Sequence, residues 1–333
     1  MKLYVSRMSK TIIVVFLLMM ISCSSIDYIS NGDNPVRTNT SNNEISLLTY
    51  NIRAIYDKEE GQIDSLMTYI NKEKFDFVLF QELFDESTRD EIIKKSDPSF
   101  YSTIISRVDY HSFPEFIFQD AGLYMMASYP RIDLSEIEFG DDVKNSNGIV
   151  HMILDKEMSK TNDFLANKSV MGSLFAINDT TRLFLFNTHV QAIGTSEHKQ
   201  YQMKQIYSFI HTTVTKVVES RFVKAPENLI VILAGDFNSN AYSPESFRAM
   251  LNKLGNPRDL HMEFNGNKQE YTWRFRSNSR PRRFDYILAY DSLSPNMFRK
   301  VAATSINTKD VKDDQNNSIS DHKALKANIR LNR

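Results

Sequence analysis

The sequence predicts one α/β domain that follows a short N-terminal targeting segment. Hydrophobic residues make up 41% of the 333 residues and aromatic residues 11%, so the chain can bury a large core and is not a disordered protein. Short apolar runs rich in β-branched and aromatic residues alternate with segments of helical periodicity. No internal repeat and no second linker interrupts them. This alternation is typical of α/β proteins.

Residues 1–22 have the pattern of a bacterial signal peptide. Three basic residues and no acid precede the apolar run TIIVVFLLMMIS (11–22), which is too short to span a bilayer. The run ends in MISC (20–23), which resembles a lipobox with Met20 in place of the usual Leu. We therefore expect a lipid anchor on Cys23 and a bacterial membrane lipoprotein that is extracytoplasmic, at the outer membrane or the cell surface. The alternative is a buried Cys at the end of a short anchor helix.

The rest of the composition excludes several classes. Cys23 is the only Cys, so disulfide scaffolds and Cys-based zinc fingers are excluded. Without residues 1–22 the chain has 37 basic and 41 acidic residues, and this charge of −4 gives no global attraction to nucleic acid. Residues 23–44 are polar and contain Asn-Gly and Asn-Pro dipeptides, which predicts a flexible tether before a domain at 45–333.

Within that domain the apolar runs predict eight strands. In chain order they are 45–52, 75–82, 121–128, 151–155, 170–177, 182–190, 228–237 and 283–290. Helical faces are predicted at 63–70, at 206–217 and at 243–254, where Ser243 is the expected cap and Pro244 the first helical residue. Residues 107–120 and 129–147 are expected to be long connections.

Polar side chains follow these strands where each strand ends. They are Asn51, Glu82, Asn187, His189, Asp236, Asn238, Asp285 and the pair Asp321-His322. In sheets flanked by helices, ligands gather at such edges. Each residue alone is explained by a turn or a surface position, but so many together indicate a site.

The types of residue indicate the chemistry. Carboxylate and amide oxygens without Cys favour a hard cation, most simply Mg²⁺, for which Mn²⁺ or Co²⁺ can substitute. Two His with nearby Asp suit acid–base catalysis at neutral pH. No Ser or Cys is placed as an evident nucleophile, and no HExxH motif favours zinc. We therefore expect metal-assisted attack of water on phosphorus.

The order of these motifs carries a family resemblance. LTYNI (48–52), FQEL (80–83), NTHVQA (187–192), GDFNSN (235–240), RFDYIL (283–288) and SDHKAL (320–325) resemble the endonuclease/exonuclease/phosphatase superfamily over residues 45 to the C-terminus. Within it, NTHVQA and AGLYMMASYP (121–130) are most similar to bacterial neutral sphingomyelinases, which are type C phosphodiesterases. The resemblance implies a four-layer α/β/β/α sandwich of two packed mixed sheets flanked by helices.

The resemblance also implies a role for each matching residue. The metal would be bound by Glu82, with Asn51 and Asp321 close to it or to its water. His322 would be the general base, oriented by Asp285. Further roles fall to Asp236, which would position the attacking water, and to Asn238 and His189, which would bind the phosphoryl group. The implied reaction hydrolyses sphingomyelin or a related phospholipid to ceramide and phosphocholine, as in sphingolipid metabolism, and we expect a monomer.

Some segments depart from the sphingomyelinase pattern. Residues 167–172 match the Lys-Gly stretch of those enzymes only loosely, so no role is assigned to Lys168. The polar segment between Tyr290 and Asp321 lacks the aromatic hairpin of the haemolytic relatives, so we expect little haemolysis. The apolar residues FPEFIF (113–118) are a candidate lipid contact, with ordinary loop packing as the alternative.

Other functions fit parts of the sequence. A DNase-like endonuclease is the main alternative, because a stretch with two aromatic residues carries Arg274, Arg276, Arg280, Arg282 and Arg283. The same stretch would suit anionic lipid headgroups. The charge of −4 and the NTHVQA motif oppose the nuclease, so no nucleic-acid partner is expected. Inositol-phosphate phosphatases of this superfamily carry a Trp-Cys-Asp-Arg motif that is absent here, and a catalytically silent surface lipoprotein is the remaining alternative.

Overall fold

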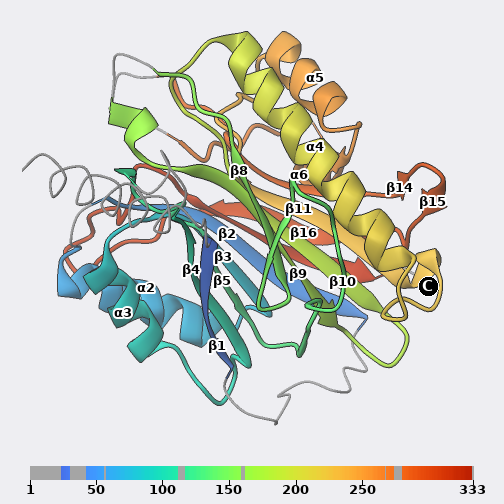
Figure 1. Ribbon diagram of the computed structural model, residues 1–333. Coiled ribbons are helices and arrows are strands. Elements are labelled where there is room, and N and C mark those ends of the chain that lie inside the picture. The colour runs from blue at the N-terminus through green and yellow to red at the C-terminus, as the bar shows by residue number, and fades with distance from the viewer. Residues whose placement is uncertain are drawn as a thin grey trace, which may run out of the picture.

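The computed structural model describes residues 24–30, 43–55, 58–111, 117–158, 162–266, 268–273 and 280–331. Two mixed β-sheets pack face to face, and helices cover the outer face of each sheet (Figure 1). This arrangement confirms the predicted four-layer α/β/β/α sandwich. In the described part of the chain, no helix has both the length and the apolar character needed to cross a membrane.

The first sheet has seven strands. Their spatial order is β1 (Ser24–Ser30), β4 (Thr103–Tyr110), β5 (Tyr124–Ala127), β3 (Phe77–Leu83), β2 (Glu44–Ala54), β17 (Ala324–Leu331) and β16 (Val301–Lys309). β2 and β3 pair in parallel, and the other neighbours are antiparallel. Because β2 and β3 are parallel, their C-terminal ends bring Asn51 and Glu82 to one edge of the sheet.

The second sheet brings three more of the predicted residues to an edge. Its spatial order is β12 (Arg258–Asp259), β13 (Asp285–Tyr290), β11 (Leu229–Asp236), β10 (Arg182–His189), β9 (Lys168–Ala176), β8 (Ile149–Leu154) and β7 (Lys144–Ser146), with β6 (Arg131–Ile132) paired to β9. β10 and β11 are parallel, so His189 lies opposite Asp236. β13 is antiparallel to β11, which places Asp285 opposite Asp236 on its other side.

The helices complete the outer layers. They are α2 (Glu60–Glu73), α3 (Glu86–Lys95), α4 (Ser196–Val218), α5 (Pro244–Lys253) and α6 (Leu260–Asn265), with the 3₁₀ turns η2 (Asn162–Leu165) and η3 (Pro226–Asn228). α2 and α3 lie on the first sheet, and α4 and α5 lie on the second (Figure 1). A two-stranded hairpin, β14 (Ser292–Leu293) and β15 (Asn296–Met297), stands apart from both sheets.

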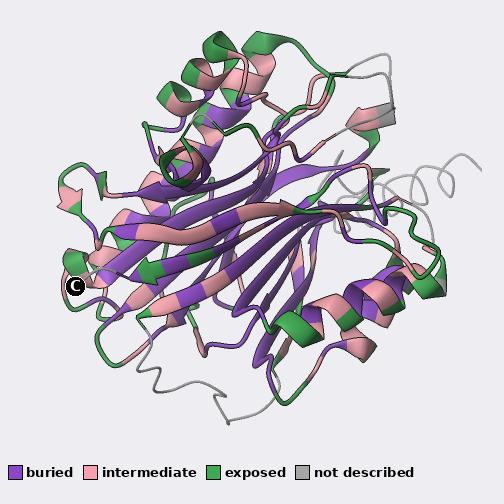
Figure 2. Ribbon diagram, turned by 180° about the vertical axis from the view of Figure 1, so that it is seen from behind, coloured by how far each residue is buried: buried purple, intermediate pink, exposed green. Residues whose placement is uncertain are grey.

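The central strands of both sheets are apolar on both faces, which explains the continuous hydrophobic runs of the sequence. In β2, Leu47 belongs to the core between the sheets, whereas its neighbour Leu48 packs with residues of α2. All residues of β11 are buried. Figure 2 shows this pattern, with buried strands in the centre and helices that expose only their outer faces. Side chains therefore reach solvent mainly at the strand ends.

Most predicted elements are present, and α5 begins at Pro244 after the cap residue Ser243 as expected. Other strands were missed. β4 occupies 103–110, so the expected connection at 107–120 begins after the strand, and β16 and β17 have too many polar residues to give an apolar run. The connection at 129–147 contains the short strands β6 and β7.

The expectation of a flexible tether at 23–44 is wrong for residues 24–30. These residues form β1, which pairs antiparallel with β4 from Ser24 opposite Tyr110 to Ser30 opposite Thr103. Ile26 is buried in the core between the sheets, and its carbonyl accepts a hydrogen bond from Asn147 Nδ2 at 3.2 Å. Polar composition concealed the strand because β1 is an edge strand whose alternate side chains face solvent. Residues 31–42 and Cys23 lie outside the described residues.

Candidate active site

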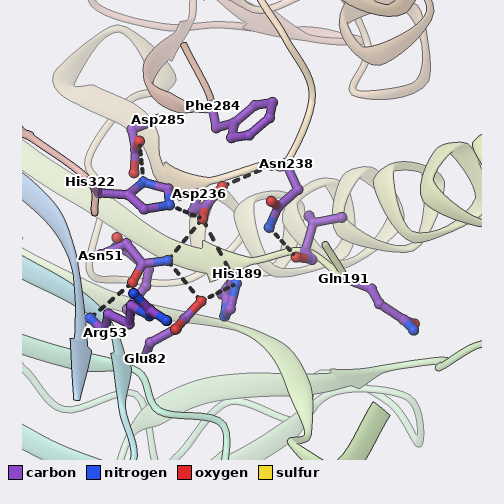
Figure 3. A network of polar contacts seen from close by, with 12 residues as sticks. Asn51, Arg53, Glu82, His189, Gln191, Asp236, Asn238, Phe284, Asp285 and His322 are labelled. Carbon is purple, nitrogen blue, oxygen red and sulfur yellow. Dashed lines mark hydrogen bonds and ion pairs between the residues drawn. The ribbon is translucent and has the colours of Figure 1, made fainter. Parts of the chain in front are cut away.

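The polar strand ends of both sheets meet at one edge of the sandwich. Figure 3 shows the side chains from β2, β3, β10, β11 and β13, together with His322, turned toward one another. Part of this group lines the wall of a cleft of about 1440 Å³. The predicted site residues on that wall are Glu82, Asp236, Asn238, Asp321 and His322. Asn51, His189 and Asp285 are buried directly behind them.

The backbone at this edge is held in an unfavourable conformation. Glu82 has φ of 56°, Arg53 has φ of 50° and Asn238 has φ of 47°, all in the left-handed region that residues other than Gly rarely adopt. Such conformations persist where the surrounding structure imposes them, and they concentrate at functional sites. Glu82 is the second-last residue of β3 and Asn238 lies two residues after β11, so the left-handed backbone at both positions stands at a strand end that borders the cleft.

Asn51 joins the two sheets at the site. Its Nδ2 donates to Glu82 Oε1 at 3.0 Å in the first sheet and to Asp236 Oδ2 at 2.9 Å in the second. Its Oδ1 accepts a hydrogen bond from the backbone N–H of Arg53 at 3.1 Å. Because the side chain is fully buried and all its contacts are fixed, Asn51 holds the two carboxylates at a set separation.

Asp285, His322 and Asp236 form an acid–base array. His322 Nδ1 lies 2.9 Å from Asp285 Oδ2, and His322 Nε2 lies 3.6 Å from Asp236 Oδ2. Burial lowers the pKa of His322, but Asp285 and Asp236 outweigh that effect and raise it to about 10. Burial raises the pKa of Asp236 to about 7, although His322 opposes the shift. The protonation of each group therefore depends on that of the other.

His189 is the second imidazole of the site. It is buried, and its Nε2 lies 3.5 Å from Glu82 Oε1 and 3.9 Å from Asp236 Oδ2. Burial, Lys168 and His322 lower the pKa of His189 well below its usual range, so the ring is neutral. Among the described residues, neither ring nitrogen has a hydrogen-bond partner. A neutral His with an unpaired nitrogen next to two carboxylates can receive a cation or a proton donor.

The residues present fit a divalent metal ion. Ligand atoms of Glu82, His189 and Asp236 all lie within 4.8 Å of one another, and a second group of this kind is formed by Asp236, Asp285 and His322. Two carboxylates and a neutral imidazole are a donor set that binds Mg²⁺, Mn²⁺ or Co²⁺. Among the described residues Asp321 belongs to neither group, and its Oδ2 instead lies 3.8 Å from Arg53 Nη1.

Residues 192–322 match the sequence profile of the Endonuclease/Exonuclease/phosphatase family. The whole sandwich is similar to solved structures that share this architecture. The chain has the fold of the endonuclease/exonuclease/phosphatase superfamily. This confirms the resemblance that the motifs predicted, and the matched segment contains Asp236, Asn238, Asp285 and His322.

The similar solved structures belong to proteins that act on different substrates. Sphingomyelinase C from Streptomyces griseocarneus matches with a TM-score of 0.59 and 16% identity over 86% of this chain and 99% of that chain. Beta toxin from Staphylococcus aureus with bound magnesium ions matches with 0.58 and 19% over 85% and 99%. D. rerio TDP2 with a single-strand DNA product matches with 0.57 and 15% over 86% and 98%. No curated protein matches the chain in sequence.

Within this superfamily fold, two of the other predicted polar residues have defined positions. Asn238 donates from its backbone N–H to Asp236 Oδ1 at 2.8 Å and from Nδ2 to the carbonyl of Val190 at 2.9 Å, and it lines the cleft. Asn187 does not reach the cleft. Its Nδ2 donates to the carbonyls of Phe80 and Tyr124, so it ties the two sheets together.

Sequence reasoning missed the residues that hold the His322–Asp285 pair. The Oγ1 of Thr272 accepts hydrogen bonds from the backbone N–H groups of Phe284 and Asp285 at 3.0 and 3.2 Å. The carbonyl of Thr272 accepts from Lys323 N–H at 2.6 Å. Thr272 therefore fixes the chain on both sides of the pair. Nothing in the run Tyr271-Thr272-Trp273 predicts this role. Its only notable feature in the sequence is that two aromatic residues precede the basic stretch.

Lys168, to which the sequence assigned no role, lies in the cleft wall. Its Nζ is 3.1 Å from Asp163 Oδ1, and its side chain is only 2% exposed. Lys168 also lowers the pKa of His189, which places a positive charge beside the neutral imidazole. The short sequence spacing of Asp163 and Lys168 was the available signal.

The predicted basic stretch is divided by the fold. Arg274 and Arg276 lie outside the described residues. Arg280 and Arg282 are exposed and line the cleft. Arg283 is fully buried and its Nη2 donates to Asp259 Oδ2 at 2.5 Å, so the interpretation of Arg283 as a surface contact is wrong.

Proposed function

We propose that the protein is a Mg²⁺-dependent phosphodiesterase that hydrolyses sphingomyelin or a related phospholipid to ceramide and phosphocholine. The observation that carries the proposal is the array of Asp285, His322 and Asp236, which opens into the cleft beside Glu82 and His189. A proton acceptor and a cation site therefore lie next to each other in this array.

The metal would be held by Glu82, His189 and Asp236, with Asn51 fixing the separation of the two carboxylates. When bound, the ion would supply positive charge to the phosphoryl oxygens, and that charge would oppose the rise in the pKa of the neighbouring His322. Asp321 and Arg53 lie at the open side of this group and line the cleft.

The remaining catalytic roles fall to side chains of the site. His322, oriented by Asp285, removes a proton from the attacking water, and Asp236 positions that water in line with the leaving oxygen. Asn238 binds a phosphoryl oxygen, and Lys168 adds positive charge beside the metal ligand His189. The leaving alcohol is ceramide, and the proton removed by His322 returns to solvent or to that alcohol.

Two observations support a lipid rather than DNA as the substrate. The NTHVQA motif is the sphingomyelinase-like segment of the sequence, and it supplies His189 to the site. Arg283 is unavailable to a polyanion because it is buried against Asp259, which weakens the basic stretch. We also propose that the protein is an extracytoplasmic lipoprotein anchored through Cys23, where it meets phospholipid.

The test is an assay of the purified protein against four substrates, each with Mg²⁺ and with EDTA. The substrates are sphingomyelin, phosphatidylcholine, plasmid DNA and an inositol polyphosphate. We expect phosphocholine release from sphingomyelin or phosphatidylcholine that EDTA abolishes. Nicking of the plasmid without lipid cleavage would overturn the lipid assignment and favour the endonuclease. Lack of turnover with all four would overturn the assignment as an enzyme.

A further inference from the structure

The N-terminal strand ends beside the cleft. β4 and β3 both pair with β5, and Thr103 and Phe77 share the partner Ala127. Both β3 and β4 are antiparallel to β5, so they run in the same direction. Counting along each strand from Ala127's partners, Tyr110 of β4 lies at the same height in the sheet as the residues that follow Glu82. Ser24 pairs with Tyr110. The first described residue of the chain is therefore at the site edge of the first sheet, three strand spacings or about 14 Å from the strand of Glu82.

Charged contacts make this edge continuous. Arg107 lies opposite Asp27 of β1, and its Nε is 3.4 Å from Asp120 Oδ2. The same carboxylate accepts a hydrogen bond from Arg89 Nη2 at 2.6 Å, and Arg89 also donates to the carbonyl of Leu83 at 2.9 Å. β1 is thus connected through two buried or half-buried guanidinium groups to the residue after Glu82.

The mouth of the cleft has an apolar rim, which we define as Ile117, Met158, Leu165 and Ile193. Their exposed fractions are 62%, 76%, 43% and 48%. Ile193 lines the cleft itself. Isolated exposed apolar side chains are ordinary, but several from separate segments around one mouth indicate an interaction surface.

Hydrogen bonds bring the segments of the apolar rim together. The backbone N–H of Gln119 donates to the carbonyl of Leu165 at 3.0 Å, and that of Ile193 donates to Asp163 Oδ2 at 3.0 Å. Gln191 Nε2 donates to the carbonyls of Glu157 and Ile193 at 2.8 and 2.9 Å. Gln119 and Asp163 line the cleft, so the rim borders its opening.

We propose that the apolar rim rests on a lipid bilayer and that an anchor on Cys23 holds the mouth of the cleft against that same membrane. The proposal rests on the lipid phosphodiesterase proposed above and identifies where its substrate comes from. Cys23 precedes Ser24 by one peptide bond, so their Cα atoms are about 3.8 Å apart. A flexible tether of residues 23–44 would instead let the domain move roughly 25 Å from the surface.

The anchor would therefore orient the domain relative to the membrane and keep it close to the membrane surface. Because β1 is part of the sheet, the anchor leaves the fold at the edge that carries the site, and the domain cannot turn its cleft away from the anchoring membrane. The occupant of the rim is therefore the outer leaflet around the anchor. A basic, polar rim would be expected for nucleic acid, whereas these four side chains are neutral and apolar.

The rim is tested first, by flotation with vesicles of phosphatidylcholine and sphingomyelin. All proteins begin at residue 23 and carry Cys23→Ser, so that neither the apolar run 11–22 nor a lipid anchor contributes to binding. The double variant Ile117→Asp/Met158→Asp is compared with Met297→Asp, a matched exposed position that is 59% accessible. Met297 lies in β15, which contacts η3 at the start of β11 and thus at the opposite edge of the sandwich. Thermal melts confirm that each variant folds.

We expect the double rim variant to bind vesicles about tenfold more weakly than the parent, because two apolar side chains are no longer buried in the membrane. The Met297→Asp variant should bind like the parent. Equal binding by the rim variant and the parent would overturn the proposal, and so would a parent that binds duplex DNA but not vesicles. The flotation assay measures vesicle binding and does not depend on hydrolysis of the lipid. Vesicle binding without phosphocholine release therefore contradicts the proposed function alone.

The anchor is tested separately with the lipidated protein in vesicles. A flexible insert of about twenty Gly and Ser residues between Cys23 and Ser24 restores the freedom of a tether. We expect hydrolysis of lipid in the protein's own vesicles to fall several-fold, with no change on a soluble short-chain substrate. Equal hydrolysis of vesicle lipid with and without the insert would overturn the role of β1 in orientation.

Discussion

Arg283 and Asp285 are two residues apart in the sequence, yet they belong to two buried charged clusters with opposite properties. Asp285 pairs with His322, which lines the cleft. Arg283 pairs with Asp259, its guanidinium carbon stacks 4.5 Å above the ring of Tyr286, and it does not line the cleft. We call these the open cluster and the sealed cluster.

The two clusters shift their His residues in opposite directions. In the open cluster two carboxylates raise the pKa of His322 to about 10 against the effect of burial. In the sealed cluster burial and then Arg283 lower the pKa of His261 to about 4, although Glu270 lies 3.8 Å from its Nε2. Burial of charge alone therefore does not mark an active site. Access to the cleft and the sign of the surrounding charge distinguish the two.

The largest expected effect is on activity, from His322→Ala in the open cluster. Loss of the proton acceptor should lower kcat/KM by about two to four orders of magnitude, because general base catalysis contributes that much. The melting temperature should fall as well, because Asp285 loses its buried partner, so activity is compared at a temperature where the variant is still folded. Steady-state kinetics and a thermal melt check both. Retained activity would show that the base is another residue.

In the sealed cluster Arg283→Met should affect stability instead. Removal of the guanidinium leaves Asp259 as an unpaired buried carboxylate, which costs about 3–5 kcal/mol in the free energy of unfolding. Urea denaturation measures this. The neighbouring Arg282→Met is the matched control, because Arg282 is exposed and should change stability little. Equal stability of the two variants would contradict the distinction between the clusters.

The pH dependence of stability should separate the clusters by sign. His261 binds its proton near pH 4 in the folded protein and near 6.5 when unfolded, so its contribution is lost as pH falls through that window. His261→Gln should remove roughly 2 kcal/mol of the destabilisation between pH 7 and pH 5. In metal-free protein, stability from the raised pKa of His322 is complete below about 6.5 and is lost as pH rises through about 10. Urea denaturation from pH 4.5 to pH 10 measures both, and parallel curves for His261→Gln and the parent would refute the assignment.

The smallest effect is expected at Thr272, which positions the open cluster from outside it. Thr272→Val leaves the N–H groups of Phe284 and Asp285 without their acceptor, so kcat should fall about tenfold with little change in KM. Thr272→Ser keeps the hydroxyl and should restore kcat. If the Ser variant is as slow as the Val variant, the hydroxyl is not what positions Asp285.

Much of the open cluster was predictable, because its residues follow apolar strands and stand in motifs. The β-branched runs identified the strands of Asn51, Glu82, His189 and Asp236. Thr272 was not predictable, because its contacts are to backbone groups, and these depend on how two loops pack. The burial of Arg283 was equally hidden, since its partner Asp259 is 24 residues away and the local sequence reads as a basic stretch.

The sequence by itself determined the class of fold, the motif order, the type of metal-binding chemistry and a candidate anchor at Cys23, because strand periodicity and motif spacing are local properties. The tertiary structure alone decided which side chains meet. Asn51 and Asp236 are 185 residues apart and touch only because two sheets pack with a particular register. Residues 24–30 read as a polar tether and became a strand because β4 offered them an unpaired edge. Pairing across a sheet depends on the partner strand, which a local pattern does not contain.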